Sequence, residues 1–346
     1  MQQTLAEPLE GVLLTGAGFT KNVGGFLSDD MRAFIVSRIQ DRPVLMGLLN
    51  NPKLDYESVY VEVMYGNYSQ EDKSALADAV FYAYKKLDDV VRNISWTQVA
   101  AHGINLYALK KLLNRFGSTV NGKRGYFFTL NQDLFVERWY GQETLLKIPG
   151  SLNLPDIHQQ PSRRLERSDY LRVPKLHDIE NIRVENSGKT SSSGRYHYLK
   201  LHGSFNWVPP NGLSDGSSRR VMVIGGKKWE QIQKEPILNY YYERFCEVLR
   251  CPNRRLCVIG YSFRDEHINN VIREALTCCG LKLFIISPKT FVDLAQEIET
   301  NDPNNGSVIR AGMRHWPWAL KTIYPSDQSR TVHADEIENA LFDHSP

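Results

Sequence analysis

The chain has 346 residues, of which 42% are hydrophobic and 23% are charged. This composition is typical of a globular protein that buries a sizeable core, and it argues against a disordered chain. The net charge of +3 is a small difference between 42 basic and 39 acidic residues, so we expect no direct contact with nucleic acid.

Cysteine usage and hydropathy bear on where the protein acts. All five cysteines lie in the stretch from Cys246 to Cys279, and they lack the paired spacing of a secreted disulfide framework. The first ten residues lack the apolar run of a signal peptide, and no stretch approaches the ~20 apolar residues that cross a bilayer. We therefore expect a cytoplasmic protein with no membrane span.

The first part of the chain predicts a strand followed by helices. An apolar run at residues 11–15 ends in a Gly-Ala-Gly turn at residues 16–18, as in a strand that enters a phosphate-binding turn. Apolar residues then recur at three- and four-residue steps over residues 28–49 and over most of residues 71–116. We predict a helix in the first of these segments and a helical layer or insertion in the second.

The middle of the chain predicts further strands and a long insertion. Residues 124–130 are aromatic and β-branched, and they stop at the polar residues 131–133. Residues 141–194 are rich in Pro, Ser, Asn and charge, which indicates an extended, loop-rich insertion. One short strand is expected at residues 196–201 and another at residues 220–224.

The last third of the chain alternates between helical and strand patterns. It predicts helix, strand, helix, strand and helix at residues 236–249, 255–259, 265–279, 281–286 and 291–298. Such alternation is typical of a parallel sheet. We therefore predict an α/β fold with a Rossmann-like parallel sheet, helices on both of its faces and an additional helical layer.

Polar residues follow the ends of five predicted strands. Ligands of open α/β sheets bind just outside the carboxyl ends of the strands, so we expect these residues to converge on one site. The five junctions are residues 16–22, 131–133, 202–204, 260–262 and 287–289.

The glycine turn by itself leaves two interpretations open. Glycines allow backbone N–H groups to approach a pyrophosphate, but Lys21 stands where a dinucleotide fingerprint has its third glycine. A plain tight turn therefore fits the glycines as well as a nucleotide loop does. Residues 187–190 (Ser-Gly-Lys-Thr) mimic the end of a phosphate loop, but no apolar strand precedes them, and we interpret them as a chance match.

Four short motifs stand at the junctions: Gly-Ala-Gly-Phe-Thr at residues 16–20, Thr-Leu-Asn-Gln-Asp at 129–133, Leu-His-Gly-Ser at 201–204 and Gly-Tyr-Ser at 260–262. In this order they resemble four motifs of the sirtuin superfamily, namely Gly-Ala-Gly-hydrophobic-Ser, Thr-Gln-Asn-Ile-Asp, Leu-His-Gly-Ser and Gly-Thr-Ser. At the fifth junction, Ser287 replaces an asparagine that many sirtuins carry. The resemblance implies a site that binds NAD.

The zinc module of the protein-deacylating sirtuins is missing. Those enzymes carry two pairs of zinc-binding cysteines after the Leu-His-Gly segment, whereas no cysteine precedes Cys246 in this chain, and we predict no metal site. This lack, together with Ile-Gly-Tyr-Ser-Phe-Arg-Asp at residues 259–265, resembles the sirtuin-like effectors of bacterial antiphage systems. That resemblance implies hydrolysis of NAD, as the substrate, to ADP-ribose and nicotinamide on infection.

The chemistry of such a reaction suggests a role for each site residue. Loss of nicotinamide leaves an oxocarbenium-like ribose, which requires an oriented water and polarised ribose hydroxyls. We predict that Asn131 positions the water and that His202 polarises a ribose hydroxyl or accepts a proton, while Asp133 holds the nicotinamide carboxamide. The rest of NAD would be bound by Gly16, Ala17, Gly18, Phe19, Thr20, Asn22, Gly260, Ser262 and Ser287.

The resemblance also implies a domain organisation and a form of control. The catalytic domain would span residues 1–300, with insertions at about 50–117 and 141–195, and an extension would follow at 301–346. We expect a separate sensor or regulatory protein, such as an ATPase, an argonaute-like protein or a nucleotide-sensing subunit, in a homo- or hetero-oligomer. Two alternatives stay open: a subunit that senses NAD or ADP-ribose, and a zinc-free deacylase or ADP-ribosyltransferase.

Overall fold

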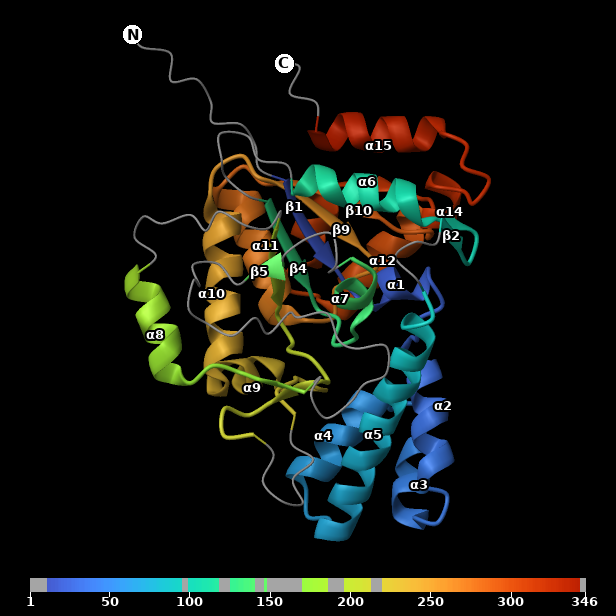
Figure 1. Ribbon diagram of the computed structural model, residues 1–346, viewed down its shortest axis with the longest axis vertical. Helices are drawn as coiled ribbons and strands as arrows, with labels where there is room; N and C mark the ends of the chain where they lie inside the picture. Colours follow the sequence, from blue (N-terminus) through green and yellow to red (C-terminus); the bar gives the residue numbers. More distant parts are fainter. Residues whose placement is uncertain are drawn as a thin grey trace.

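The computed structural model describes residues 11–94, 99–117, 125–140, 146–147, 170–185, 196–212 and 220–342. A sheet of seven parallel strands runs through the centre of these segments (Figure 1). Across the sheet the strands are β11 (Met313–Trp316), β10 (Lys282–Ile286), β9 (Arg255–Ile259), β1 (Gly11–Thr15), β4 (Gly125–Thr129), β7 (Tyr196–Lys200) and β5 (Leu146–Lys147). Because β4 lies on one side of β1 and β9 on the other, the strand order reverses at β1.

The strand sequences explain why both faces of the sheet are buried. In β1, Leu13 packs into the core on one face, whereas Val12 and Leu14 pack into the core on the other. The same alternation recurs in β9 and β10. Parallel strands that are covered on both faces consist of continuous apolar runs, as these strands do.

Helices cover both faces of the sheet, which confirms the predicted α/β fold. One core includes residues of α6 (Leu106–Phe116), α14 (Leu320–Ile323) and α15 (Val332–Phe342). The other includes residues of α10 (Pro236–Arg250), α11 (Glu266–Cys278), α12 (Phe291–Asn301) and α13 (Gly306–Gly312). The segment beyond residue 300 also supplies β11, which pairs with β10.

A layer of helices lies beyond the carboxyl ends of the strands (Figure 1). It comprises α2 (Ser28–Arg38), α3 (Pro43–Leu49), α4 (Tyr56–Tyr65) and α5 (Gln70–Val91). The layer is tied to the sheet by a buried ion pair, in which Nε of Arg138 lies 2.6 Å from Oδ1 of Asp88. Asp88 belongs to α5, and Arg138 belongs to α7 (Phe135–Trp139), which follows β4.

Of the two helical predictions in the first part of the chain, the one for residues 28–49 needs correction, whereas residues 71–116 are mostly helical as predicted. Residues 28–49 form two helices, because α2 ends at Arg38 and Pro43 begins α3, where its missing N–H is not needed. Within residues 71–116, α5 ends at Val91, and a hairpin of β2 (Ala100–Ala101) and β3 (Ile104–Asn105) precedes α6. Gly103 has φ +81, which allows the tight turn between these two strands.

The strand predicted at residues 220–224 is wrong. Met222 forms only an isolated bridge with Gly203, and the N–H of Val223 donates to the carbonyl of His202 at 2.9 Å. The segment therefore covers the loop that follows β7 instead of joining the sheet.

Several short elements were not predicted from the sequence. Besides α7, α13, α14, β5 and β11, they include α1 (Ala17–Lys21), β6 (Leu171–Arg172), α8 (Leu176–Glu185), β8 (Trp207–Val208) and α9 (Lys228–Lys234). Most of the predicted insertion at residues 141–195, including residues 187–190, lies outside the described residues. None of the helices in the described segments is both long enough and apolar enough to cross a bilayer.

Candidate active site

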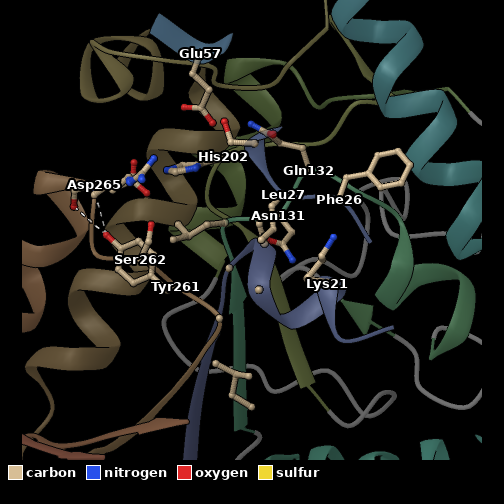
Figure 2. A pocket seen from close by; sticks show the side chains of 18 of the residues that line it. Lys21, Phe26, Leu27, Glu57, Asn131, Gln132, His202, Tyr261, Ser262 and Asp265 are labelled. Carbon is tan, nitrogen blue, oxygen red and sulfur yellow. Dashed lines mark hydrogen bonds between the residues drawn. The ribbon is translucent and has the colours of Figure 1, made fainter. Parts of the chain in front are cut away.

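All five predicted junctions line one cavity of about 1440 Å³ at the carboxyl edge of the sheet. Its floor is formed by the ends of β10, β9, β1, β4 and β7, which are consecutive neighbours in the sheet. Figure 2 shows Asn131, His202 and Ser262 around this cavity. Helices α4, α5 and α9 contribute further lining residues from outside the sheet.

The ends of β1 and β9 are in unusually close contact, which explains the three glycines there. The N–H groups of Gly16 and Gly18 donate to the carbonyls of Ile259 and Gly260 at 3.0 and 2.9 Å. A Cβ atom at Gly16 would lie 2.6 Å from the carbonyl oxygen of Gly260, and one at Gly260 would lie 2.1 Å from the nitrogen of Phe19. Gly260 also has φ +70. The glycines are therefore required for backbone packing, whatever ligand binds nearby.

The loop that carries Ser262 is held from below by buried polar groups. The Asn269 side chain donates to the carbonyl of Phe263 and to Oδ2 of Asp302, both at 2.8 Å, and it accepts from the Tyr261 hydroxyl at 3.0 Å. The N–H of Asp265 donates to the same Tyr261 hydroxyl at 3.1 Å (Figure 2). These contacts fix the loop, and Ser262 lies at the cavity surface.

Asn131 is oriented by a chain of hydrogen bonds that starts at a buried carboxylate. The Thr20 hydroxyl donates to Oδ2 of Asp133 at 3.0 Å, and Nδ2 of Asn131 donates to the Thr20 hydroxyl at 3.0 Å. Because the single hydroxyl proton points at Asp133, Thr20 can only accept from Asn131. The amide NH₂ therefore faces Thr20. The other oxygen of Asp133 accepts from the N–H of Phe135 at 2.9 Å.

A buried ion pair supports this chain from within the core. Nζ of Lys200 lies 2.8 Å from Oε1 of Glu137, and it also donates to the carbonyl of Asp133. Both side chains are buried, and burial raises the pKa of Glu137 even though Lys200 opposes the shift. The ammonium of Lys200 thereby holds the backbone of Asp133 in place at the end of β4.

His202 lies beside a second histidine that the sequence did not indicate as a site residue. The Nε2 atoms of His202 and His267 are 3.4 Å apart. Burial lowers the pKa of His202 to about 3 and that of His267 to about 4, although Asp265 opposes both shifts. Both imidazoles are therefore neutral at physiological pH.

A lysine bridge lies next to the two histidines, and its residues were also missed. Nζ of Lys228 is 2.9 Å from Oδ1 of Asp265 and 3.0 Å from Oε2 of Glu57. Burial alone would lower the pKa of Lys228, but the two carboxylates outweigh it and raise this pKa. Burial alone would raise the pKa of Asp265, but Lys228 lowers it to about 2. The bridge joins α4, α9 and the start of α11.

The other predicted binding residues divide into two groups. Gly16, Ala17 and Ser287 line the cavity, as does Asn22, whose side chain donates to the carbonyl of Gly18 at 2.6 Å. Phe19 and Thr20 are buried behind the cavity surface: the Phe19 ring packs edge-on against aromatic core residues, and Thr20 supports Asn131. Phe19 and Thr20 are thus placed to shape the site rather than to contact a ligand.

The row of junctions has the dimensions of a dinucleotide. Four strand spacings of ~4.8 Å separate the end of β10 from the end of β7, so the floor spans ~19 Å. Ser287 lies at one end of this row, the glycine turn at its centre, and Asn131 and His202 at the other end.

Among the described residues, no three His, Cys, Asp or Glu side chains cluster so as to hold a metal ion.

Comparison with known proteins identifies a related family. The family model described as a SIR2-like domain matches residues 125–302, which is half of the chain. The match includes Asn131, His202 and Ser262, while the glycine turn precedes it. No curated protein matches the chain.

The hydroxyl of Thr20 is expected to be essential for the stability of the site. Replacement of Thr20 by Val removes a donor to the buried Asp133 carboxylate while it preserves the shape of the side chain. We expect the free energy of unfolding to fall by about 1–3 kcal/mol, measured by urea denaturation. Thr20→Ser keeps the hydroxyl and serves as the matched control. Equal stability of the Val and Ser variants would contradict the hydrogen-bond chain.

The two buried histidines are expected to make stability depend on pH. Below about pH 6.5 the unfolded chain binds protons at His202 and His267, whereas the folded chain does not. Above about pH 7 the histidines are neutral in both states and do not lower the free energy of unfolding. This free energy falls as the pH drops below about 6.5, and the fall ends near pH 4 for His267 and near pH 3 for His202.

Urea denaturation between about pH 7.5 and 4.5 tests this dependence. The double variant His202→Gln/His267→Gln should lose less stability over this range than the parent protein, by up to about 1.4 kcal/mol per pH unit for each histidine. Parallel pH profiles of the two proteins would show that the histidines titrate normally in the folded state.

Proposed function

The chain belongs to the SIR2-like family, whose domain implies the use of NAD, and we propose that it hydrolyses NAD to ADP-ribose and nicotinamide. The proposal depends above all on one observation: Asn131 and His202 follow neighbouring strands at one end of a row of junctions long enough for a dinucleotide. The nicotinamide ribose would lie at this end, and the adenosine would lie near Ser262 and Ser287. The diphosphate would cross the centre at the glycine turn.

The glycine turn can bind the diphosphate although the N–H groups of its two glycines, Gly16 and Gly18, are not free to do so. The N–H groups of Gly16 and Gly18 are hydrogen-bonded to the end of β9. The N–H of Phe19 donates to the carbonyl of Gly16 at 2.9 Å, so the N–H of Ala17, the first residue of α1, is the amide of this turn that could meet the diphosphate. The diphosphate would approach this first turn, where the small residues leave room.

The proposed reaction breaks one bond and forms another. The bond between the anomeric carbon of ribose and the nicotinamide nitrogen breaks, and its electron pair leaves with neutral nicotinamide. Water then attacks the oxocarbenium-like carbon, forms the new C–O bond and releases one proton. Dipoles that are already oriented toward the developing charge lower the barrier to such a step.

Asn131 is suited to orient the attacking water. Its NH₂ group faces Thr20, so its Oδ1 atom is the end of the amide that is directed away from this contact. An oxygen acceptor can take one proton of the water and aim a lone pair at the anomeric carbon. A neutral His202, for its part, can accept a hydrogen bond from a ribose hydroxyl or take up a proton.

Asp133 has a further place in the proposal. Its two oxygens already accept from Thr20 and from the backbone of Phe135. A carboxylate offers about four lone-pair sites, so Asp133 can still accept from the NH₂ group of the nicotinamide carboxamide. One residue would thus orient Asn131 and bind the leaving group.

An enzyme that destroys NAD needs a means of control. We propose that this activity is released in the cytoplasm only when a signal is sensed, and the resemblance to antiphage effectors suggests infection as that signal. A separate sensor protein or assembly into an oligomer would supply the control. The helical layer α2–α5 borders the cavity and offers a surface through which such a partner could act.

The proposal is tested by following NAD and nicotinamide by chromatography. We expect Asn131→Ala and His202→Ala each to reduce nicotinamide release at least about 100-fold, because each removes a group that acts on the reacting ribose or its water. Glu274→Gln is the matched control. Glu274 lies on the exposed face of α11, where it pairs with Arg250 of α10, and its replacement should leave the rate unchanged.

Three outcomes would contradict the proposal in different ways. Full activity of both alanine variants would refute the assigned roles. Binding of NAD without its loss, both by the protein alone and after exposure to the proposed signal, would indicate a sensor of NAD or ADP-ribose. Loss of NAD that occurs only when an acylated peptide is added would indicate a deacylase or transferase.

A further inference from the structure

His267 is the one imidazole that faces His202 across the cavity edge in the part of the chain described by the structure. Their Nε2 atoms are 3.4 Å apart, and the ring planes are inclined by 42°. Both residues line the cavity. His202 follows β7, whereas His267 lies in the first turn of α11, so the contact joins two separate elements.

The protonation of this pair is constrained by its geometry. Two neutral imidazoles can share a hydrogen bond through their Nε2 atoms only if one of these atoms carries a proton and the other does not. The pair therefore presents one donor and one acceptor to the same point. A hydroxyl group is itself one donor and one acceptor, so it matches the pair.

We propose that His202 and His267 hold a single hydroxyl of the nicotinamide ribose between their Nε2 atoms. His202 accepts the hydroxyl proton, and Nε2–H of His267 donates to the hydroxyl oxygen. To admit an oxygen with normal hydrogen bonds of ~2.8 Å, the two nitrogens need to separate by only about 1 Å. This inference rests on the proposed cleavage of NAD, and it makes His267 a second residue that contacts the substrate.

The surroundings of His267 hold its ring in place. The ring stacks on that of Trp229 with centroids 6.4 Å apart, and it also contacts the ring of Tyr242 at 5.9 Å. The Tyr242 hydroxyl donates to the carbonyl of His267 at 3.1 Å. Two aromatic rings and a backbone hydrogen bond thus fix an imidazole that is still accessible from the cavity.

Burial keeps the two imidazoles neutral, while the charged groups around them act in both directions. Asp265 precedes α11, whose first residue is the exposed Glu266; α9 contributes Lys228, and Asp55 and Glu57 lie at the start of α4. The negative charge of Asp265 favours protonated histidines, and Lys228, whose Nζ lies 2.9 Å from Oδ1 of Asp265, opposes this effect only in part. Burial outweighs both charges. A neutral pair is what the proposed hydroxyl clamp requires.

The test compares substrates as well as variants. His267→Phe keeps an aromatic ring beside Trp229 and Tyr242 but removes both nitrogens. Its rate of nicotinamide release is measured with NAD and with two NAD analogues, each lacking one hydroxyl of the nicotinamide ribose. We expect kcat for NAD to fall about 10- to 100-fold with little change in KM, and we expect the loss to vanish for the analogue that lacks the clamped hydroxyl.

A conservative variant and a folding control complete the experiment. His267→Gln retains an N–H donor and should recover part of the lost rate, while Glu274→Gln on the same helix should behave as the parent protein. An unchanged thermal midpoint shows that the Phe variant is folded. An equal loss with all three substrates would assign His267 a purely structural role, and no loss with NAD would overturn the clamp outright.

Failure of the clamp can be told apart from failure of the proposed function. If the parent protein releases no nicotinamide, either alone or after exposure to the proposed signal, the proposed hydrolysis is wrong, and calorimetric binding of the same three dinucleotides then tests the clamp. The clamp is supported if His267→Phe binds NAD more weakly than the parent protein does but binds one of the two deoxy analogues equally well. Identical affinities of the parent and variant for all three overturn it.

Discussion

The contact between the ends of β1 and β9 constrains the rest of the site. Gly16 and Gly18 donate to carbonyls at the end of β9, and Gly260 passes so close to Phe19 that no Cβ atom fits between them. Any side chain at these positions would push the two strand ends apart at the point where the strand order reverses. Since ligands of such sheets bind at that point, the contact sets the depth of the cavity floor.

The polar groups of this floor avoid the cost of burying an unpaired charge in two ways, by pairing and by remaining neutral. Lys200 and Glu137 neutralise each other in the core, and they support Asp133, which in turn orients Thr20 and Asn131. A buried charge is tolerated only with partners, so each side chain in this series of hydrogen bonds is held in one orientation. His202 instead remains neutral through burial, which suits it to accept a hydrogen bond or proton.

The sequence predicted the five inner strands of the sheet and the floor of the cavity because both depend on local patterns: apolar runs mark the strands, and polar residues mark their ends. It did not predict the edge strands β5 and β11. It failed where distant segments meet. Glu57, Lys228 and His267 come from three helices, and each one alone resembles an ordinary surface or helix residue. The sequence likewise could not show that Thr20 lies behind Asn131, or that Val223 pairs with the backbone of His202 instead of extending the sheet.

The central claim is that NAD lies across the five strand ends, with its nicotinamide ribose at β4 and β7. A crystal structure of the Asn131→Ala variant with bound NAD tests this claim most directly, because slow cleavage should preserve the dinucleotide. The account predicts the nicotinamide ribose within hydrogen-bond distance of His202, the diphosphate at the glycine turn, and the adenosine near Ser262 and Ser287. A dinucleotide bound in the reverse direction, or outside this cavity, would contradict it.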